Sequence, residues 1–249
     1  MKLAKYLTIA TLSMVMFSCG SETTKKTETN EDKTEVKVEK KDAVTIRDGL
    51  SVRAEPSKDG KWLSRLSLGE KVVYLGKSKV DSTDKQNYEY HYVELSDGSK
   101  VWAYAYGLLI DAKPAVVIDE TPIYKRPDLV TKSDEDLAVM EFVAIVGEKD
   151  EWIEIVNAGK KKKGWIKKEN VVKNDQDVAV SIMAYKTLKN KEGEIELENI
   201  PAFIEEIPYS DSRFIDYLQN MYDLDQEKDK AFGEKSDDTA DTVVEALNE

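Results

Sequence analysis

The sequence YHYVELSDGSKVWAY, residues 90–104, decides the fold class of this chain. Both of its arms are rich in aromatic and β-branched residues, which are typical of β-strands. Between the arms, Ser96-Asp97-Gly98-Ser99 has the composition of a tight turn. The stretch therefore predicts an antiparallel hairpin.

Short runs of the same kind precede this hairpin, among them VVYL at residues 72–75, and turn residues such as Pro56 and Gly69 separate them. Several short strands within residues 43–111 predict a small β-barrel. Alternation along the runs predicts the side chains that line its interior, namely Val52, Val72, Leu75, Val93, Leu95 and Trp102.

The pattern occurs twice in the chain. VVYLG at 72–76 matches VAIVG at 143–147, an offset of 71 residues that falls to 60 where YVEL matches WIEI. The first copy therefore carries about eleven extra residues, which we place in the segment KVDSTDKQNYE. Such self-similarity predicts two copies of one fold, over residues 43–111 and 114–173.

Both copies resemble the bacterial SH3-like domain, the SH3b family, whose sequences typically read L-N-V-R-x-x-P, then G-x-x-V, W-x-x-V and G-x-x-G-W-V. The first copy follows this pattern in LSVRAEP, LGEKV and YVEL, and in Gly98 and Trp102. The second copy departs from it at Thr121-Pro122-Ile123-Tyr124 and recovers at Gly147, Trp152 and Gly164-Trp165-Ile166. The resemblance covers about half of the chain and none of it after Asn174.

This resemblance implies a mainly β fold with two small SH3-like β-barrels and a non-enzymatic binding role. The implied ligand is peptidoglycan or another polymer of the cell envelope. A protein-interaction scaffold at the cell surface, docking a partner protein or a host ligand, is the alternative. Nucleic acid is not an expected partner, because the sequence pI is about 4.8 and the expected compartment is extracytoplasmic.

Residues 1–18 have the layout of a signal peptide, since Lys2 and Lys5 precede an apolar run shorter than the ~20 residues of a membrane-spanning helix. The run ends in Met16-Phe17-Ser18-Cys19, which resembles the lipobox of bacterial lipoproteins. That resemblance implies cleavage before Cys19, acylation of its thiol, and a lipid-anchored protein on the periplasmic face or the cell surface. The alternative is an ordinary secretory signal in which the chain's single cysteine occurs by chance.

Charged segments lie on both sides of the two copies. Residues 20–42 hold 7 acidic and 6 basic residues with almost no large apolar side chain, which predicts a disordered tether behind Cys19, over residues 19–42. Residues 175–249 hold 20 acidic and 7 basic residues, and the apolar spacing over 174–249 predicts an acidic α-helical region. We expect its helices at 177–189, after Pro201, from a cap at Ser210 or Ser212 through 214–222, and at 239–247.

No catalytic constellation is present in the sequence. His91 is the single histidine, the single cysteine belongs to the expected anchor, and no Gly-x-Ser-x-Gly turn occurs. A hydrolase that uses His91 is therefore the least favoured hypothesis. The spacing of Asp223, Asp225, Glu227, Asp229 and Glu234 matches a calcium loop, but Lys228 stands where such a loop needs glycine. We expect no metal and no cofactor.

Two features are candidates for ligand binding. Tyr88 and Tyr90 share one strand face with Tyr92, and Tyr104 and Tyr106 follow Trp102, so their rings could contact a glycan or a peptide. The second feature is the run Lys160-Lys161-Lys162-Lys163, at an expected hairpin tip. Lys161 and Lys162 are candidates to bind anionic headgroups or wall polymers, or to contact the acidic tail of the same chain.

Overall fold

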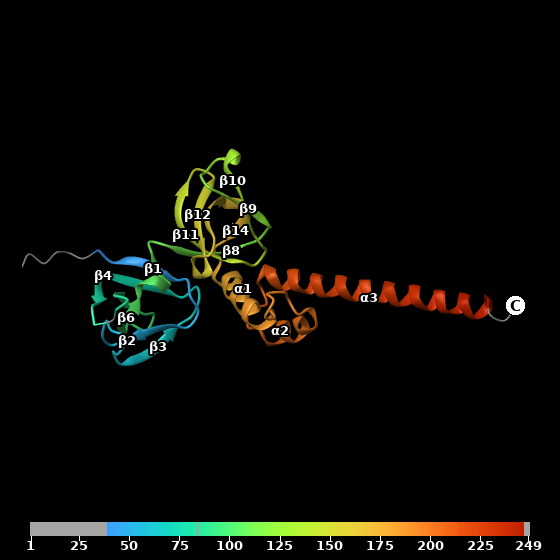
Figure 1. The fold of residues 1–249 in the computed structure, drawn as a ribbon, viewed down its shortest axis with the longest axis horizontal. Helices are drawn as coiled ribbons and strands as arrows, with labels where there is room; N and C mark the ends of the chain where they lie inside the picture. The colour runs from blue at the N-terminus through green and yellow to red at the C-terminus, as the bar shows by residue number, and fades with distance from the viewer. Residues whose placement is uncertain (1–38, 84, 247–249) are drawn as a thin grey trace, which may run out of the picture. The chain divides into compact units, whose positions relative to one another are not determined.

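The computed structural model describes residues 39–83 and 85–246, with side chains as far as residue 230. In this part of the chain the fold is mainly β, with two seven-stranded antiparallel sheets followed by three α-helices (Figure 1). The prediction of a mainly β fold with C-terminal helices is confirmed. Cys19, the signal peptide and the tether as far as residue 38 lie outside the described residues.

The two sheets have the same strand order. In the first, the order is β3-β2-β6-β5-β4-β1-β7, and the second repeats it as β10-β9-β13-β12-β11-β8-β14. The first sheet contains β1 (Lys41–Thr45), β2 (Leu50–Arg53), β3 (Trp62–Leu66), β4 (Lys71–Asp81), β5 (Tyr88–Glu94), β6 (Lys100–Tyr104) and β7 (Leu108–Ile110). The second contains β8 (Lys113–Val117), β9 (Thr121–Tyr124), β10 (Lys132–Leu137), β11 (Phe142–Lys149), β12 (Trp152–Asn157), β13 (Lys163–Lys167) and β14 (Val171–Val172).

The first strand begins earlier than the sequence pattern indicated. We placed residues 41–42 in the tether, but β1 starts at Lys41, which pairs with Tyr74 of β4. Lys41 also forms an ion pair of 2.7 Å with Asp111. Backbone pairing overrides side-chain composition here, because pairing with β4 extends β1 to residues whose side chains stay at least partly exposed.

Each sheet encloses its own apolar core. In the first sheet Val52, Val72 and Val93 are buried as predicted, whereas Trp102 is half-exposed. The neighbours of Trp102 in β6, Val101 and Ala103, face the core instead, so strand alternation places the indole on the opposite face. The prediction of Trp102 as a core residue is therefore wrong, and Leu75 and Leu95 are likewise only half-buried.

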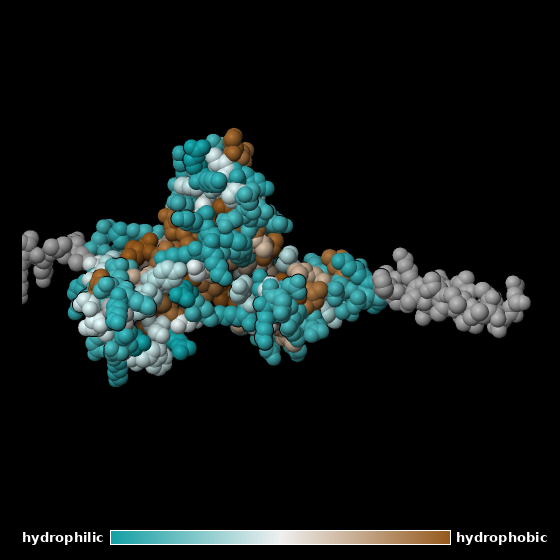
Figure 2. Space-filling view, viewed as in Figure 1, coloured by the Kyte–Doolittle hydropathy of each residue, from teal (hydrophilic) through white to brown (hydrophobic). Residues whose placement is uncertain are grey.

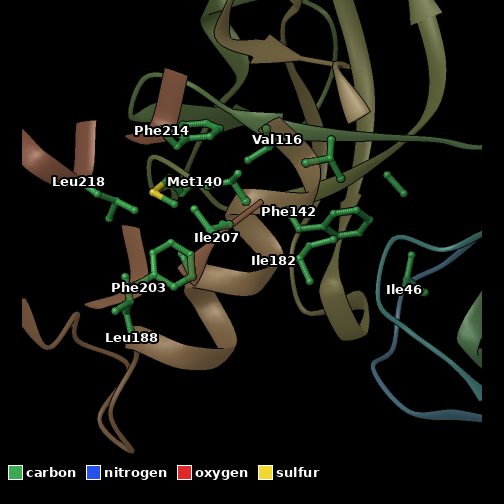
Figure 3. Packing of buried hydrophobic residues seen from close by; sticks show 14 of the residues in the cluster. Ile46, Val116, Met140, Phe142, Ile182, Leu188, Phe203, Ile207, Phe214 and Leu218 are labelled. Atoms are coloured by element: carbon green, nitrogen blue, oxygen red, sulfur yellow. The ribbon is translucent and has the colours of Figure 1, made fainter. Parts of the chain in front are cut away.

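A third core lies between the sheets and the helices (Figure 3). Ile46, which follows β1, joins Phe142 of β11 and Ile182 of the first helix in this cluster. The amide of Gly159, in the loop between β12 and β13, donates a hydrogen bond of 2.8 Å to the carbonyl of Ile46. The two sheets are thus joined by backbone and side-chain contacts.

The helices are α1 (Asp175–Leu188), α2 (Ile200–Glu206) and α3 (Arg213–Ala246). Asn174 caps α1, Pro201 lies in the first turn of α2, and Ser212 precedes α3 and accepts a hydrogen bond from the amide of Phe214. We predicted separate helices at 214–222 and 239–247, but α3 is continuous as far as Ala246. The residues between them include no proline, so nothing interrupts the backbone ladder.

The acidic residues that match a calcium loop all lie in α3, so they belong to a helix rather than a loop. No helix in the described part of the chain combines the length and the apolar character needed to cross a membrane.

Candidate functional site: an aromatic face and an adjoining pocket

Six aromatic side chains lie together on the outer face of β5 and β6 and the short turn after β6. Tyr90 pairs with Tyr104 across the two strands, and Tyr92 pairs with Trp102 two residues further on. Side chains two residues apart in a strand point to the same side, so these pairs form one continuous surface. We call it the aromatic face; its members are Tyr88, Tyr90, Tyr92, Trp102, Tyr104 and Tyr106.

The rings of this face contact one another in two groups. Tyr104 is central, with its ring centroid 5.1 Å from that of Tyr88, 6.1 Å from that of Tyr90 and 6.1 Å from that of Tyr106. Tyr92 and Trp102 form a separate pair at 4.9 Å. Such edge-on and tilted contacts fix the ring planes, which leaves rigid surfaces for a ligand.

The members of the aromatic face differ in exposure. Tyr90 is buried, with 5% of its surface exposed, so it supports the ring of Tyr104 from beneath. Tyr106 is 45% exposed, and Tyr88 and Tyr104 are half-buried. Burial raises the pKa of Tyr104 above the ordinary value of 10.0, so its hydroxyl stays protonated and able to donate a hydrogen bond at neutral pH.

A cross-strand row extends the same face over the rest of the first sheet. Arg53 of β2 pairs with Trp62 of β3 on one side and with Trp102 on the other. Trp62 is 53% exposed at the sheet edge. At the far end of the row, the ammonium of Lys77 lies 5.8 Å from the centre of the Tyr92 ring. The row across five strands therefore holds three aromatic side chains, Trp62, Trp102 and Tyr92, and two cationic ones, Arg53 and Lys77.

The opposite end of the aromatic face opens into a pocket of about 610 Å³. Its lining includes Tyr88, Glu89, His91, Tyr104, Tyr106 and Lys160. Four of these residues lie in β5 and β6 and Tyr106 lies in the short turn after β6, whereas Lys160 comes from the loop between β12 and β13 of the second sheet. The pocket is therefore shared by the two sheets.

Two cations lie on the ring of Tyr106. The ammonium of Lys160 is 4.8 Å from the ring centre, and the guanidinium of Arg47 is 5.3 Å from it, both within cation–π range. Among the described residues neither cation has a carboxylate partner. Partial burial lowers the pKa of Lys160 below its ordinary 10.5, which indicates that its charge is incompletely solvated. This corner of the pocket suits an anionic group.

His91 is held by neighbours that do not form a catalytic triad. The Oγ of Ser78 lies 2.8 Å from its Nδ1, and Oε1 of Glu89 lies 4.0 Å from the same nitrogen. A serine triad instead uses the two ring nitrogens for the two partners. Burial lowers the pKa of His91 below 6.5, so the ring is neutral at pH 7.

The lysine run divides between different environments. Lys162 is half-buried. Its ammonium donates a hydrogen bond of 2.6 Å to the carbonyl of Asp136 and forms an ion pair of 3.1 Å with Glu141. Lys161 is exposed and lines a separate pocket of about 230 Å³, next to α1. The structure thus brings Lys160, and not the two predicted lysines, to the tyrosines.

Sequence patterns did not assign three residues to this surface, namely Arg47, Lys160 and Trp102. Trp102 could have been found from alternation with its small buried neighbours. No local pattern marks Arg47 or distinguishes Lys160 from the next lysines. Across the residues that the structure describes, no group of three or more His, Cys, Asp or Glu is placed to hold a metal ion.

Comparison with known proteins finds no matching family model and no matching curated protein. Similar solved structures include NlpC2 and NlpC1 from Trichomonas vaginalis, which are 16% and 17% identical to this chain, each with a TM-score of 0.23. The likeness covers 61% and 60% of this chain and 57% and 53% of theirs, so the chain spans little more than half of their length. At such a TM-score the likeness is too low to support any inference about fold or activity.

Proposed function

We propose that this protein is a non-enzymatic, membrane-anchored lipoprotein that binds a cell-envelope polymer, peptidoglycan, through the aromatic face. The first and second sheets are taken to be two small SH3-like β-barrels, each closed around its own core. Support for the barrels comes from their identical strand order and from the SH3b sequence pattern. The anchor at Cys19 and the tether behind it rest on the sequence alone.

The single observation that carries this proposal is that the aromatic face ends at two cations, Lys160 and Arg47, that have no carboxylate partner among the described residues. Sugar rings have apolar faces that stack on Tyr and Trp side chains. The stem peptides of peptidoglycan carry carboxylates, which bind Lys and Arg by charge-assisted hydrogen bonds. A surface with stacking rings beside Lys160 and Arg47 therefore complements both parts of the polymer.

The non-enzymatic part of the proposal rests on His91. Its side chain is the one imidazole of the chain, and both polar neighbours lie at the same ring nitrogen. In a serine triad the nucleophile and the acid lie at different ring nitrogens, and the acid orients the imidazole. Ser78 and Glu89 both lie at Nδ1, so Glu89 does not have that orienting position. Binding without bond cleavage is the function that these residues support.

Sedimentation with purified sacculi tests the proposal. The protein used is the compact unit Val38–Glu249, which lacks the anchor and contains all the described cores. We expect it to pellet with sacculi, and we expect the double variant Tyr106→Ala/Lys160→Ala to bind roughly ten-fold more weakly because stacking and charge contacts are both lost.

A matched control exists at the C-terminal end of α1. There the ammonium of Lys189 lies 4.5 Å from the ring centre of Tyr185, so Tyr185→Ala/Lys189→Ala removes the same chemistry from a different surface. That control should pellet like the wild type. Peptidoglycan binding would be refuted if the wild type stayed in the supernatant, and the role of the aromatic face would be refuted if both double variants pelleted equally.

A further inference from the structure

The most exposed apolar side chains of the second sheet are adjacent residues at its tip. Leu129 is 64% exposed and Val130 is 90% exposed, within the short 3-10 turn Leu129–Thr131 that connects β9 to β10. Figure 2 shows a hydrophobic patch at this end of the sheet, surrounded by hydrophilic surface. Single exposed apolar residues are common, but an adjacent pair on one tip indicates a contact surface.

The tip is held in shape by its own hydrogen bonds. The side chain of Asp128 accepts a hydrogen bond of 3.0 Å from the amide of Val130. Thr131 accepts one from the amide of Arg126 at its Oγ1 and donates its own amide to the carbonyl of Asp128. The amide of Lys125 closes the loop by donating to the carbonyl of Thr131. The apolar pair is therefore presented by an ordered turn, with little ordering entropy left to lose on binding.

Cations surround the apolar pair. Lys125, Arg126 and Lys132 are all exposed, and between residues 125 and 132 they are opposed by one acid, Asp128. In the described part of the chain none of the three cations forms an ion pair. The acids of β10, Asp134, Glu135 and Asp136, follow Lys132 along the strand, away from the turn.

We propose that this tip, residues 125–132, inserts Leu129 and Val130 into the interface of an anionic lipid bilayer. Apolar side chains at a convex tip enter the boundary between headgroups and acyl chains, while flanking Lys and Arg contact anionic headgroups. An anionic membrane is the occupant that fits both features. The tip contact is independent of sacculus binding, and it lies on the second sheet whereas the aromatic face lies on the first.

The contact is weak by itself and gains from tethering. Two apolar residues and three cations give modest membrane affinity. A chain that is already anchored meets the bilayer at high effective concentration, so a weak second contact would be occupied. The consequence is that the tip would fix the orientation of the second sheet on the membrane.

Vesicle binding by the unit Val38–Glu249 tests this proposal without the anchor. The probes are vesicles of phosphatidylcholine alone and of phosphatidylcholine and phosphatidylglycerol in equal parts. We expect binding to the anionic vesicles, weakened roughly ten-fold or more by Leu129→Ser/Val130→Ser. Leu224→Ser, at an apolar residue of α3 that is 57% exposed, is the control and should bind like the wild type.

A label gives a second readout that does not depend on affinity. Because Cys19 is the single cysteine of the whole chain, Val130→Cys in this unit creates a unique attachment point for an environment-sensitive dye. Insertion predicts a blue shift of its emission on anionic vesicles that high salt reverses. The absence of that shift, or equal vesicle binding by the wild type and the double serine variant, would overturn the proposal, and a protein partner would then be the occupant to seek.

Discussion

Gly164, in β13, occupies a position that other residues cannot occupy without strain. Its φ is 151°, and a Cβ added there would lie 2.5 Å from Cγ2 of Ile123 and 2.7 Å from the carbonyl oxygen of Tyr124. These atoms belong to β9, which crosses close to β13 where Trp165 pairs with Tyr124. The absence of a side chain lets the two strands approach each other.

Replacing Gly164 is expected to destabilise the protein. Gly164→Ala should lower the free energy of unfolding by about 3 kcal/mol, because it adds both a backbone strain and a steric clash. Gly159→Ala is the control, since Gly159 also has a positive φ of 72° but has no atom within 4 Å of the added Cβ, and it should cost only about 1 kcal/mol. Urea denaturation measures the free energy of unfolding of both variants. Equal losses would contradict the steric clash at Gly164.

Single residues also decide the candidate site. Lys160 and Lys162 are two residues apart in one run, yet one lies on Tyr106 and the other pairs with Glu141. Lys160 has a positive φ of 59° directly after Gly159, and this local backbone reversal directs it toward the first sheet. The environment of each lysine thus depends on its backbone position rather than on residue type.

At the scale of elements, a carboxylate of α1 caps the start of α3. Asp177, in the first turn of α1, is buried, and its Oδ1 accepts hydrogen bonds of 2.7 Å from the hydroxyl of Ser212 and 3.0 Å from the amide of Arg213. Both donors stand at the start of α3. One carboxylate therefore satisfies donors at the N-terminus of a second helix.

Removing that carboxylate should destabilise the helical region. Asp177→Ala leaves the buried hydroxyl of Ser212 and the amide of Arg213 without their acceptor, and we expect a loss of about 2–3 kcal/mol of unfolding free energy. Asp175→Ala is matched to it, because Asp175 is in the same first turn but is exposed, and its ion pair with Lys71 lies at the surface. A surface pair of this kind is worth at most about 1 kcal/mol.

Chemical denaturation at pH 7, followed by circular dichroism at a helix-sensitive wavelength, compares these two variants. The cap that Asp177 provides for α3 would be ruled out as a stabilising element if Asp177→Ala and Asp175→Ala shifted the denaturation midpoint by the same amount.

At the scale of the molecule, the core between the sheets couples parts that are far apart in the chain. Phe142 of β11 and Ile182 of α1 both pack against the turn of Gly69 in the first sheet, where an added Cβ would lie 2.7 Å from Ile182 and 3.2 Å from Phe142. Ion pairs of 2.6 Å join Lys186 of α1 to Asp48 and Lys71 to Asp175. The first sheet is therefore held to the helices as well as to the second sheet.

This coupling predicts that damage to one sheet spreads to the other. Phe142→Ala should lower the unfolding free energy by about 3–5 kcal/mol, as expected for a buried aromatic side chain. Amide hydrogen exchange should then show reduced protection in β4 and β5 of the first sheet as well as in β11 and β12. Val130→Ala, at an exposed residue in the turn between β9 and β10, serves as control. It should change neither the unfolding free energy nor the hydrogen exchange of either sheet. Unchanged protection in the first sheet of Phe142→Ala would show that the sheets unfold independently.

Features that depend on neighbouring residues could be read from the sequence. The turn at residues 96–99 connects β5 and β6, where Gly98 has a φ of 83° and the amide of Leu95 donates to the carbonyl of Ser99. The starts of α2 and α3 were marked by Pro201 and Ser212 for the same reason. Turn residues, caps and alternation act within a few positions of the chain, so a sequence carries their signal directly.

The sequence by itself therefore determined the β character of residues 43–173, the repeated pattern within them and the helical region that follows. Only the tertiary structure decided that Lys160 meets Arg47 on one tyrosine ring and that α1 packs against both sheets. The physical reason is the separation along the chain of the residues that interact. These arrangements come from contacts between residues tens of positions apart, whose energy depends on packing and burial in three dimensions and leaves no periodic trace along the chain.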